Sequence, residues 1–187
     1  PTPHLVLACD TGNITIPPGV NKDEVFIEEF HIPTRRFEPD GRTAPVRDIY
    51  TKTIRRLHEI YTAIANGTPL QDDSGTLFPG LSSLSLDGVY RLNQMLIDGT
   101  CMLNNVNEPG DMGNKTQKFW GSRLLSIMTI FTQFAGLGIN VGFTTWERYE
   151  TREDGSPTGR IFPEIGGKMD VVGAGLADAV LYCFIQG

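Results

Sequence analysis

The sequence predicts an α/β domain whose sheet is mostly parallel and flanked by helices. Three observations lead to this fold class. Short apolar runs alternate with longer segments of helical periodicity, which is the order of elements in α/β folds. The first run, Leu5–Asp10, is apolar almost throughout, as is typical of a strand covered on both faces in a parallel sheet. The 187 residues fit one domain with a sizeable core.

Composition narrows the class of protein. Hydrophobic residues make up 40% of the chain and charged residues 20%, which predicts a folded globular protein rather than a disordered one. The net charge of -6 disfavours a free-standing nucleic-acid binder, because such proteins cluster Lys and Arg. Three scattered cysteines indicate reduced thiols and a cytoplasmic location. The uncharged stretch Leu124–Trp146 holds several polar residues and glycines, so we expect a buried helix and strand there and no membrane contact.

The first half of the chain yields three elements. Leu5–Asp10 is followed by a turn, and Val25–Phe30 is a second short strand. A polar loop, Pro33–Pro45, precedes an amphipathic helix over Val46–Ile64, whose apolar residues recur at three- and four-residue spacing. Gly67 stands where a helix C-terminal cap belongs. The basic residues on the opposite side of this helix predict a solvated face.

The central part continues the alternation. A turn-rich segment leads into the strand Leu81–Asp87, and a short helix follows over Val89–Leu96. The stretch Asn104–Lys118 is polar and turn-prone, which predicts a long loop. A helix over Phe119–Phe134 and a strand over Ile139–Thr145 come next.

The last part is predicted to hold a charged loop over Glu150–Arg160, a glycine turn at Gly166-Gly167-Lys168, and a final strand over Ala179–Phe184. The chain starts at Pro1, close to its first apolar run, which suggests a fragment of a longer protein.

Asp87 is the strongest candidate for chemistry. It ends an apolar strand, which is where open α/β sheets place ligand-binding groups. An ionised Asp in this setting is costly unless it meets a metal, a water or a helix N-terminus. Two interpretations stay open: Asp87 binds a metal, or it caps the helix that begins at Val89. Asp10 has the same setting one strand away, with an ordinary turn acid before Gly12 as the alternative.

Polar residues also follow the strand that begins at Ile139. Thr145, Trp146 or Glu147 could sense a phosphate or position a water, although Trp146 could equally be a core aromatic whose N–H finds a partner. Further on, paired glycines at 166–167 would let the backbone approach a ligand, and Lys168 supplies a point charge. A plain turn is the alternative there. The three histidines lack metal-ligand spacing, so no zinc site is predicted.

In their order along the chain, these features resemble the RecA-like core of P-loop ATPases, and within it the phage-encoded RecA-like ATPases. The resemblance covers 1–187 as a single RecA-like domain and implies ATP and Mg²⁺ as cofactors. It implies that Asp87 is the magnesium-side acid and that Asp87, Asp10, Thr145 and Glu147 are the catalytic residues. The nucleotide contacts that it implies are Thr144, Trp146, Gly166, Gly167 and Lys168.

Two departures from that family matter. The 187 residues contain no G-x-x-x-x-G-K-[ST] phosphate loop, so the first strand and the phosphate loop would lie before Pro1. That loop positions the β- and γ-phosphates in the family. The family often has a Glu just after the strand matched here by Leu5–Asp10, and this chain has Asp10-Thr11-Gly12 instead. Asp10 is therefore the nearest substitute for the catalytic base.

The resemblance also implies partners. The family's DNA-binding loops would match Asn104–Lys118 and Glu150–Arg160, which points to single-stranded DNA bound by a homo-oligomer in the cytoplasm of a bacterial host. Neither segment strongly combines basic residues with aromatic ones, which is the usual composition of single-strand binding sites.

Two alternatives from other classes remain. RNase H-like nucleases, including phage packaging nucleases, gather acids around two metals about 4 Å apart, and Asp10, Asp87 and either Asp170 or Asp178 could form such a cluster. The third possibility is a non-catalytic α/β interaction module that has lost its chemistry.

Overall fold

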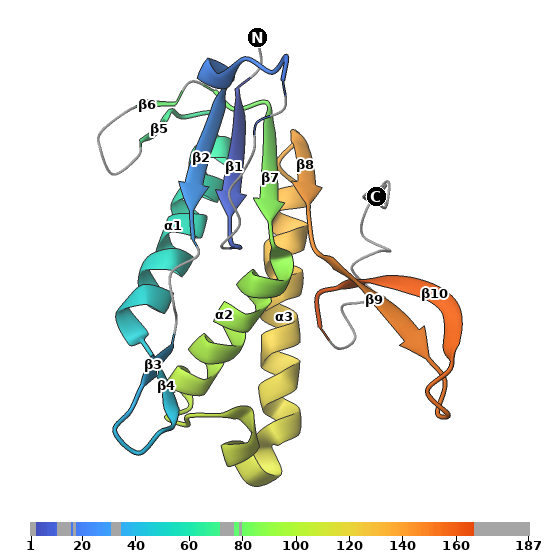
Figure 1. Cartoon of the computed structure of the whole chain (residues 1–187). Helices are drawn as coiled ribbons and strands as arrows, with labels where there is room; N and C mark the ends of the chain where they lie inside the picture. Colours follow the sequence, from blue (N-terminus) through green and yellow to red (C-terminus); the bar gives the residue numbers. More distant parts are fainter. Residues whose placement is uncertain are drawn as a thin grey trace.

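The centre of the domain is a four-stranded parallel sheet with the strand order β2-β1-β7-β8 (Figure 1). A computed structural model of the chain describes residues 3–10, 16, 18–30, 35–71, 77–78 and 80–166. All three strand pairings in the sheet are parallel, which confirms the predicted α/β class. The strands are β1 (His4–Ala8), β2 (Val25–Glu29), β7 (Ser83–Asp87) and β8 (Asn140–Phe143).

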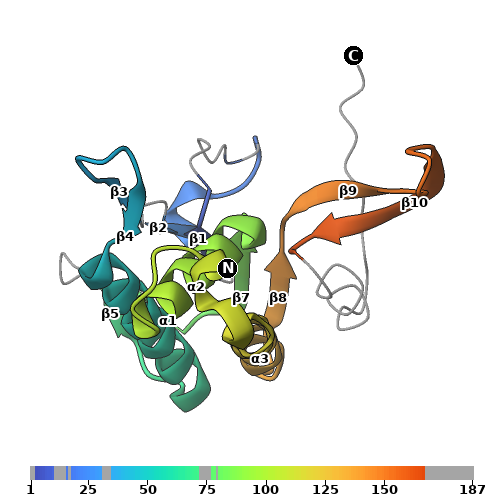
Figure 2. The ribbon, with the colours of Figure 1, turned by 90° about the horizontal axis from the view of Figure 1, so that it is seen from below.

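Three helices lie on the same side of this sheet (Figures 1 and 2). They are α1 (Arg47–Asn66), α2 (Val89–Leu103) and α3 (Thr116–Ala135). The connection through α1 takes the chain from β2 past β1 to β7, and α2 and α3 then connect β7 to β8. Both crossovers advance in the same direction along the sheet, and right-handed crossovers that do so place their helices on one face.

The core lies between the sheet and these helices. Leu84 and Leu86 of β7 are fully buried on the helix side, whereas Ser83 and Ser85 on the other side are half-buried. The apolar run predicts that β1 is covered on both faces, but its Val6 is only half-buried, and α1, α2 and α3 all lie on the other side (Figure 2). Leu5 and Leu7 of β1 are fully buried toward the helices. Buried side chains of this core include Leu5, Leu7, Ile60, Leu84, Leu86, Leu92, Ile127 and Phe134.

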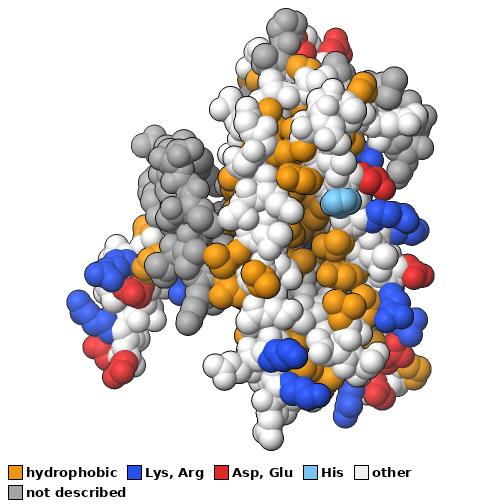
Figure 3. Space-filling view, turned by 180° about the vertical axis from the view of Figure 1, so that it is seen from behind, with side chains coloured by type: hydrophobic (Ala, Val, Ile, Leu, Met, Phe, Trp, Pro, Cys, Tyr) orange, Lys and Arg blue, Asp and Glu red, His pale blue; other side chains and the backbone are white. Residues whose placement is uncertain are grey.

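The amphipathic helix α1 is confirmed, with its C-terminal cap. Gly67 has φ of 62° in the left-handed region, which glycine adopts without steric cost. The outer side of α1 is charged and exposed, and charged side chains gather along the corresponding edge in Figure 3. Arg56 is an exception to the predicted solvated face, because its guanidinium donates to both carboxylate oxygens of Glu28 in β2, at 2.5 and 2.9 Å. This pair ties α1 to the edge strand of the sheet.

The predicted loop over Glu150–Arg160 was wrong, because most of it belongs to a hairpin. The strands β9 (Trp146–Thr151) and β10 (Pro157–Glu164) pair antiparallel and project from the body of the domain (Figure 1). At the tip, the Asp154 carboxylate accepts the Ser156 N–H at 2.9 Å, and Gly155 has φ of 81°. An Asp-Gly turn between strands is a strong hairpin pattern, and the charged composition obscured it.

Three other predictions need refinement. The polar loop before α1 contains a small hairpin, β3 (Arg35–Phe37) with β4 (Thr43–Pro45). The helix predicted over Val89–Leu96 continues to Leu103, because its buried polar groups find partners inside the fold. The stretch expected as a long loop contains the 3-10 helix η2 (Pro109–Lys115) and the first turn of α3.

The remaining short elements are η1 (Lys22–Glu24), β5 (Leu70–Gln71) and β6 (Leu77–Phe78). The uncharged stretch from Leu124 forms the end of α3 and then β8, as predicted, but no residue of β8 is buried. Among the described helices, none has the length and apolarity needed to cross a membrane. The predicted strand over Ala179–Phe184 lies outside the described residues.

Candidate functional site

The carboxyl ends of three neighbouring strands bring two predicted acids and a hydroxyl to one edge of the sheet. Asp87 ends β7, Asp10 follows β1 by two residues, and Thr144 directly follows β8. Ala8 of β1 is in register with Asp87, and the Cys9 N–H donates to the Asp87 carbonyl at 2.8 Å. This edge is where open α/β sheets bind their ligands.

Thr144 links β8 to the Asp87 carboxylate. Its hydroxyl donates to Asp87 Oδ1 and accepts the Gly88 N–H at 3.0 Å, while its carbonyl accepts the Val89 N–H at 2.9 Å. One hydroxyl can donate once and accept twice, so both side-chain bonds can form together. Among the described residues, Asp87 Oδ2 has no hydrogen-bond partner, and Asp87 is only half-buried. Oδ2 is therefore the oxygen of this carboxylate that can bind a ligand.

The interpretation of Asp87 as a helix cap was wrong. The N-cap position of α2 belongs to Gly88, in the left-handed conformation with φ of 81°, and no side chain caps this helix end. The strand therefore turns into the helix through a glycine, and the Asp87 carboxylate is directed to Thr144 instead.

Gly88 also brings the two acids together. A Cβ on this residue would lie 2.8 Å from the Cβ of Asp10 and 3.0 Å from its backbone nitrogen, so the ends of β1 and β7 are in direct contact here. The neighbouring Cys9 is buried, and its burial together with the charges of Asp87 and Asp10 raises the pKa of the thiol to about 12. The edge thus carries a negative field that favours a cation.

The donor set at this edge fits magnesium. Asp87 Oδ2 is a hard oxygen ligand, and Asp10 adds a second carboxylate from the adjacent strand. Mg²⁺ is usually held by one or two carboxylates together with waters and substrate phosphates. In the part of the chain that the structure describes, no group of three His, Cys, Asp or Glu could hold a metal ion. A cation at this edge would therefore keep waters or phosphate oxygens among its ligands.

Trp146 lies beside this edge rather than in the core. It is 62% exposed, which rules out the interpretation as a core aromatic. Its ring stacks on Tyr90, with the ring centres 6.4 Å apart and the planes 19° from parallel. Tyr90 follows Gly88 by two residues, so Trp146 contacts the first turn of α2, which begins directly after Asp87 and Gly88.

Thr145 and Glu147, also predicted at this strand end, contact other groups. The Thr145 hydroxyl donates to the carbonyl of Glu164 and so closes the base of the β9–β10 hairpin. Glu147 is exposed, and its carboxylate accepts the Tyr149 hydroxyl at 2.6 Å, which raises the pKa of Tyr149. Neither makes a described contact with Asp10 or Asp87, so only Thr144 of this group bonds to Asp87.

Three successive carbonyl groups, those of residues 164–166, each accept a hydrogen bond from a different element. The donors are Thr145 after β8, Asn93 of α2 and Arg123 of α3. The Asn93 amide lies 2.5 Å from the second carbonyl, and Arg123 Nη2 lies 3.1 Å from the third. Arg123 Nε also donates to Asn93 Oδ1 at 2.7 Å. We call these three donors the carbonyl clamp.

The clamp explains Gly166 without a ligand. A Cβ there would lie 2.8 Å from Asn93 Nδ2 and 2.9 Å from Arg123 Nη2, and φ is 113°, so only glycine fits between the two side chains. Gly167 and Lys168 lie outside the described residues. Sequence reasoning missed Asn93 and Arg123, although a charged residue four positions from both Phe119 and Ile127 in an apolar stripe is a recognisable pattern.

Comparisons with protein families, curated proteins and solved structures gave no match to this chain. Its function is therefore argued from the geometry of the sheet edge and from the residues placed there.

Thr144→Val should lower the free energy of unfolding without changing the shape of this sheet edge. The substitution removes the acceptor of the Gly88 N–H and the donor to Asp87, and a polar group left unpaired in a partly buried site costs about 1–3 kcal/mol. Chemical denaturation should show a loss of free energy of unfolding near the lower end of this range. Thr144→Ser keeps the hydroxyl and should lose less than half as much; equal losses for the two variants would contradict the assigned hydrogen bonds.

Proposed function

We propose that this chain forms part of a RecA-like ATP site and supplies its magnesium-side and sensor-side residues. The observation that carries the proposal is the placement of Asp10 and Asp87 at the ends of adjacent parallel strands, with Thr144 at the end of the next strand bonded to Asp87. In nucleotide-hydrolysing folds, an acid at a strand end helps to hold Mg²⁺, which bridges the β- and γ-phosphates.

Each residue has a distinct role in this proposal. Asp87 would hold the ion, directly or through a water, with Oδ2. The Thr144 hydroxyl would orient that carboxylate. Because Thr144 lies between β8 and β9, a movement of the carboxylate would also move these two strands. Asp10 would accept a proton from the attacking water in place of the family's Glu. Trp146, stacked on Tyr90 beside the edge, would contact the nucleotide.

The phosphates themselves need a further contributor. The 187 residues contain no G-x-x-x-x-G-K-[ST] loop, and ATP hydrolysis by this chain alone is not part of the proposal. In the RecA-like family the nucleotide usually lies between subunits, so a homo-oligomer is expected, with single-stranded DNA as a partner. Two large side chains on the projecting hairpin, Trp146 at 62% and Tyr149 at 54% exposure, are apolar surface that such a contact would bury.

The nuclease alternative needs three acids within metal-bridging distance. Among the described residues only Asp10 and Asp87 of its proposed cluster are present. Asp170 and Asp178, which it would use, lie outside the described residues.

Asp87→Asn should weaken magnesium-dependent nucleotide binding. The measurement uses the Trp120→Phe variant, in which Trp146 is the only tryptophan. With ATP present, added Mg²⁺ should change the emission of Trp146, because its ring stacks on Tyr90 in the helix turn that follows Asp87. Removing the ligand itself should lower the apparent magnesium affinity about tenfold or more, since loss of an outer-shell partner alone costs about 10–100-fold.

Asp48→Asn is the matched control, because it removes the same charge from the exposed first turn of α1 and should leave the titration unchanged. An unaltered magnesium titration in Asp87→Asn would overturn the proposal. The same proteins incubated with DNA and Mn²⁺ test the alternative: cleavage that disappears in both Asp10→Asn and Asp87→Asn would favour the nuclease.

A further inference from the structure

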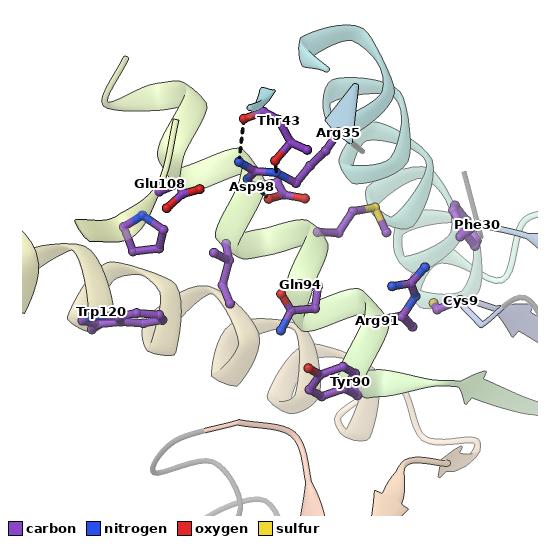
Figure 4. Close-up of a pocket in the computed structure, with 13 residues that line it drawn as sticks. Cys9, Phe30, Arg35, Thr43, Tyr90, Arg91, Gln94, Asp98, Glu108 and Trp120 are labelled. Atoms are coloured by element: carbon purple, nitrogen blue, oxygen red, sulfur yellow. Dashed lines mark hydrogen bonds and ion pairs between the residues drawn. The ribbon is translucent and has the colours of Figure 1, made fainter. Parts of the chain in front are cut away.

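A groove of about 690 Å³ runs along α2, next to the sheet edge but separate from the Asp87 carboxylate. Figure 4 shows Trp120 and Glu108 toward one end and Tyr90, Arg91 and Cys9 toward the other, with Gln94 between them. Its volume falls within the roughly 300–1,000 Å³ of small-molecule sites. The ATP-site proposal does not use this groove.

Two of the four charged side chains that line the groove neutralise each other. Arg35 pairs with Asp98 at 2.5 Å and also donates to the backbone carbonyl of Asn107 at 2.6 Å. The Glu108 carboxylate accepts a backbone N–H in the capping box of η2. Arg91 is exposed and makes no ion pair with any described residue. Among the described residues, the two unpaired charges of the groove are therefore Glu108 toward the Trp120 end and Arg91 toward the Tyr90 end, and the Arg91 end favours an anion.

The groove also offers an aromatic face and an unused amide. Trp120 remains 41% exposed, although Arg123 lies 5.7 Å from the centre of its ring. Gln94 is half-buried and its amide has no hydrogen-bond partner among the described residues. An amide both donates and accepts, which matches the edge of a planar heterocycle. Gln94 follows Arg91 by three residues, so the two side chains are neighbours on one helix face.

We propose that this groove binds a nucleobase together with its phosphate. The base stacks on Trp120, Gln94 hydrogen-bonds the edge of the base, and Arg91 pairs with the phosphate. Aromatic stacking combined with a basic contact is how proteins hold unpaired nucleotides without reading sequence. The unit can belong to a single strand or to a free nucleotide. The inference goes beyond the proposed ATP site, because it requires neither Asp87 nor a metal ion.

The first test follows Trp120 directly. In Trp146→Phe, which keeps an aromatic ring against Tyr90, Trp120 is the only tryptophan. In buffer containing EDTA, oligothymidylate should quench its emission to saturation, and an abasic strand of the same length should bind about tenfold or more weakly because it cannot stack. Thymidine monophosphate separates the two sources: quenching by the strand alone identifies a strand segment, and equal affinity per base identifies a free nucleotide.

Variants then separate stacking from charge. With a fluorescently labelled strand, Trp120→Leu should reduce affinity about tenfold and remove the difference between thymidylate and abasic strands. Arg91→Gln should lower the slope of log affinity against log salt by about 0.7, as expected for one lost phosphate contact on a single strand. Phe37→Ala and Arg47→Gln, which alter an exposed aromatic and an exposed arginine outside the groove, should leave binding unchanged.

The proposal is overturned if neither strand nor mononucleotide quenches Trp120, or if Trp120→Leu and Arg91→Gln bind as tightly as the two control variants. Asp87→Asn distinguishes this result from the fate of the ATP-site proposal, since it should bind the labelled strand normally in EDTA. A protein that loses its magnesium titration but keeps strand binding separates the two sites.

Discussion

Arg123→Met should be among the most destabilising substitutions in this protein, with an expected loss of about 3 kcal/mol in the free energy of unfolding. Arg123 is only 4% exposed, and its guanidinium donates to Asn93 Oδ1 at 2.7 Å and to the Gly166 carbonyl at 3.1 Å. Methionine fills similar space but donates nothing. Both acceptors would then be left without this donor inside the fold, and each unpaired buried group costs about 1–3 kcal/mol.

Urea denaturation of the whole chain, followed by circular dichroism, measures this loss. Arg55→Met is the matched control, because the Arg55 side chain is 67% exposed on α1, and surface substitutions usually change stability by about 0.5 kcal/mol or less. Asn93→Leu combined with Arg123→Met should cost less than the sum of the single changes, since both act on one network. Equal losses for the two arginine variants, or strict additivity of the pair, would contradict the carbonyl clamp.

Gly88→Ala should damage both stability and the acidic edge. A left-handed conformation costs a non-glycine residue about 1–2 kcal/mol, and φ at Gly88 is 81°. The added Cβ would also meet the Asp10 Cβ at 2.8 Å, and crowding of this kind costs about 1–3 kcal/mol. The expected total is about 3 kcal/mol, with Asp10 displaced from the end of β7.

Gly155→Ala is the matched control, because it has the strained backbone conformation without the clash. Gly155 has the same φ of 81°, and nothing lies within 4 Å of a Cβ placed there, so it should lose only the conformational part. Denaturation curves of the two variants therefore report the crowding at Asp10 by difference. The Trp146 titration with Mg²⁺ and ATP should weaken in Gly88→Ala and persist in Gly155→Ala. Equal stability of the two variants would contradict the close contact between the ends of β1 and β7.

The fold was predictable where local pattern and tertiary burial agree. The apolar runs at Leu5 and Leu81 lie in adjacent parallel strands, and the helix ending at Gly67 ends where its left-handed cap demands. Prediction failed where charge obscured a turn. The charged residues around Asp154-Gly155 predict a loop. In the structure, Asp154 accepts the Ser156 N–H in a turn, and the flanking residues pair as a projecting hairpin.

The candidate site was predictable in part for the same reason. Asp87 is the last residue of one apolar strand and Asp10 follows another by two residues, so their position at the sheet edge follows from strand length alone. Thr144, which the resemblance assigns to the nucleotide, bonds to Asp87. The carbonyl clamp was not predictable, because Asn93 and Arg123 donate to carbonyl groups distant in sequence. Every residue has a backbone carbonyl, so the residue type does not reveal which one accepts a side-chain hydrogen bond.

By itself the sequence determined the α/β class, the parallel strands and the acids at their carboxyl ends, because period, strand length and cap residues are local properties. Only the tertiary structure decided what those acids contact. The Asp87 carboxylate bonds to Thr144 rather than to the N-terminus of α2, because the backbone turns at Gly88. The tertiary structure also placed Gln94, Arg91 and Trp120 along one groove. Such pairings depend on how helices pack across the sheet, and that packing is set by the sum of many weak apolar contacts spread over the whole chain.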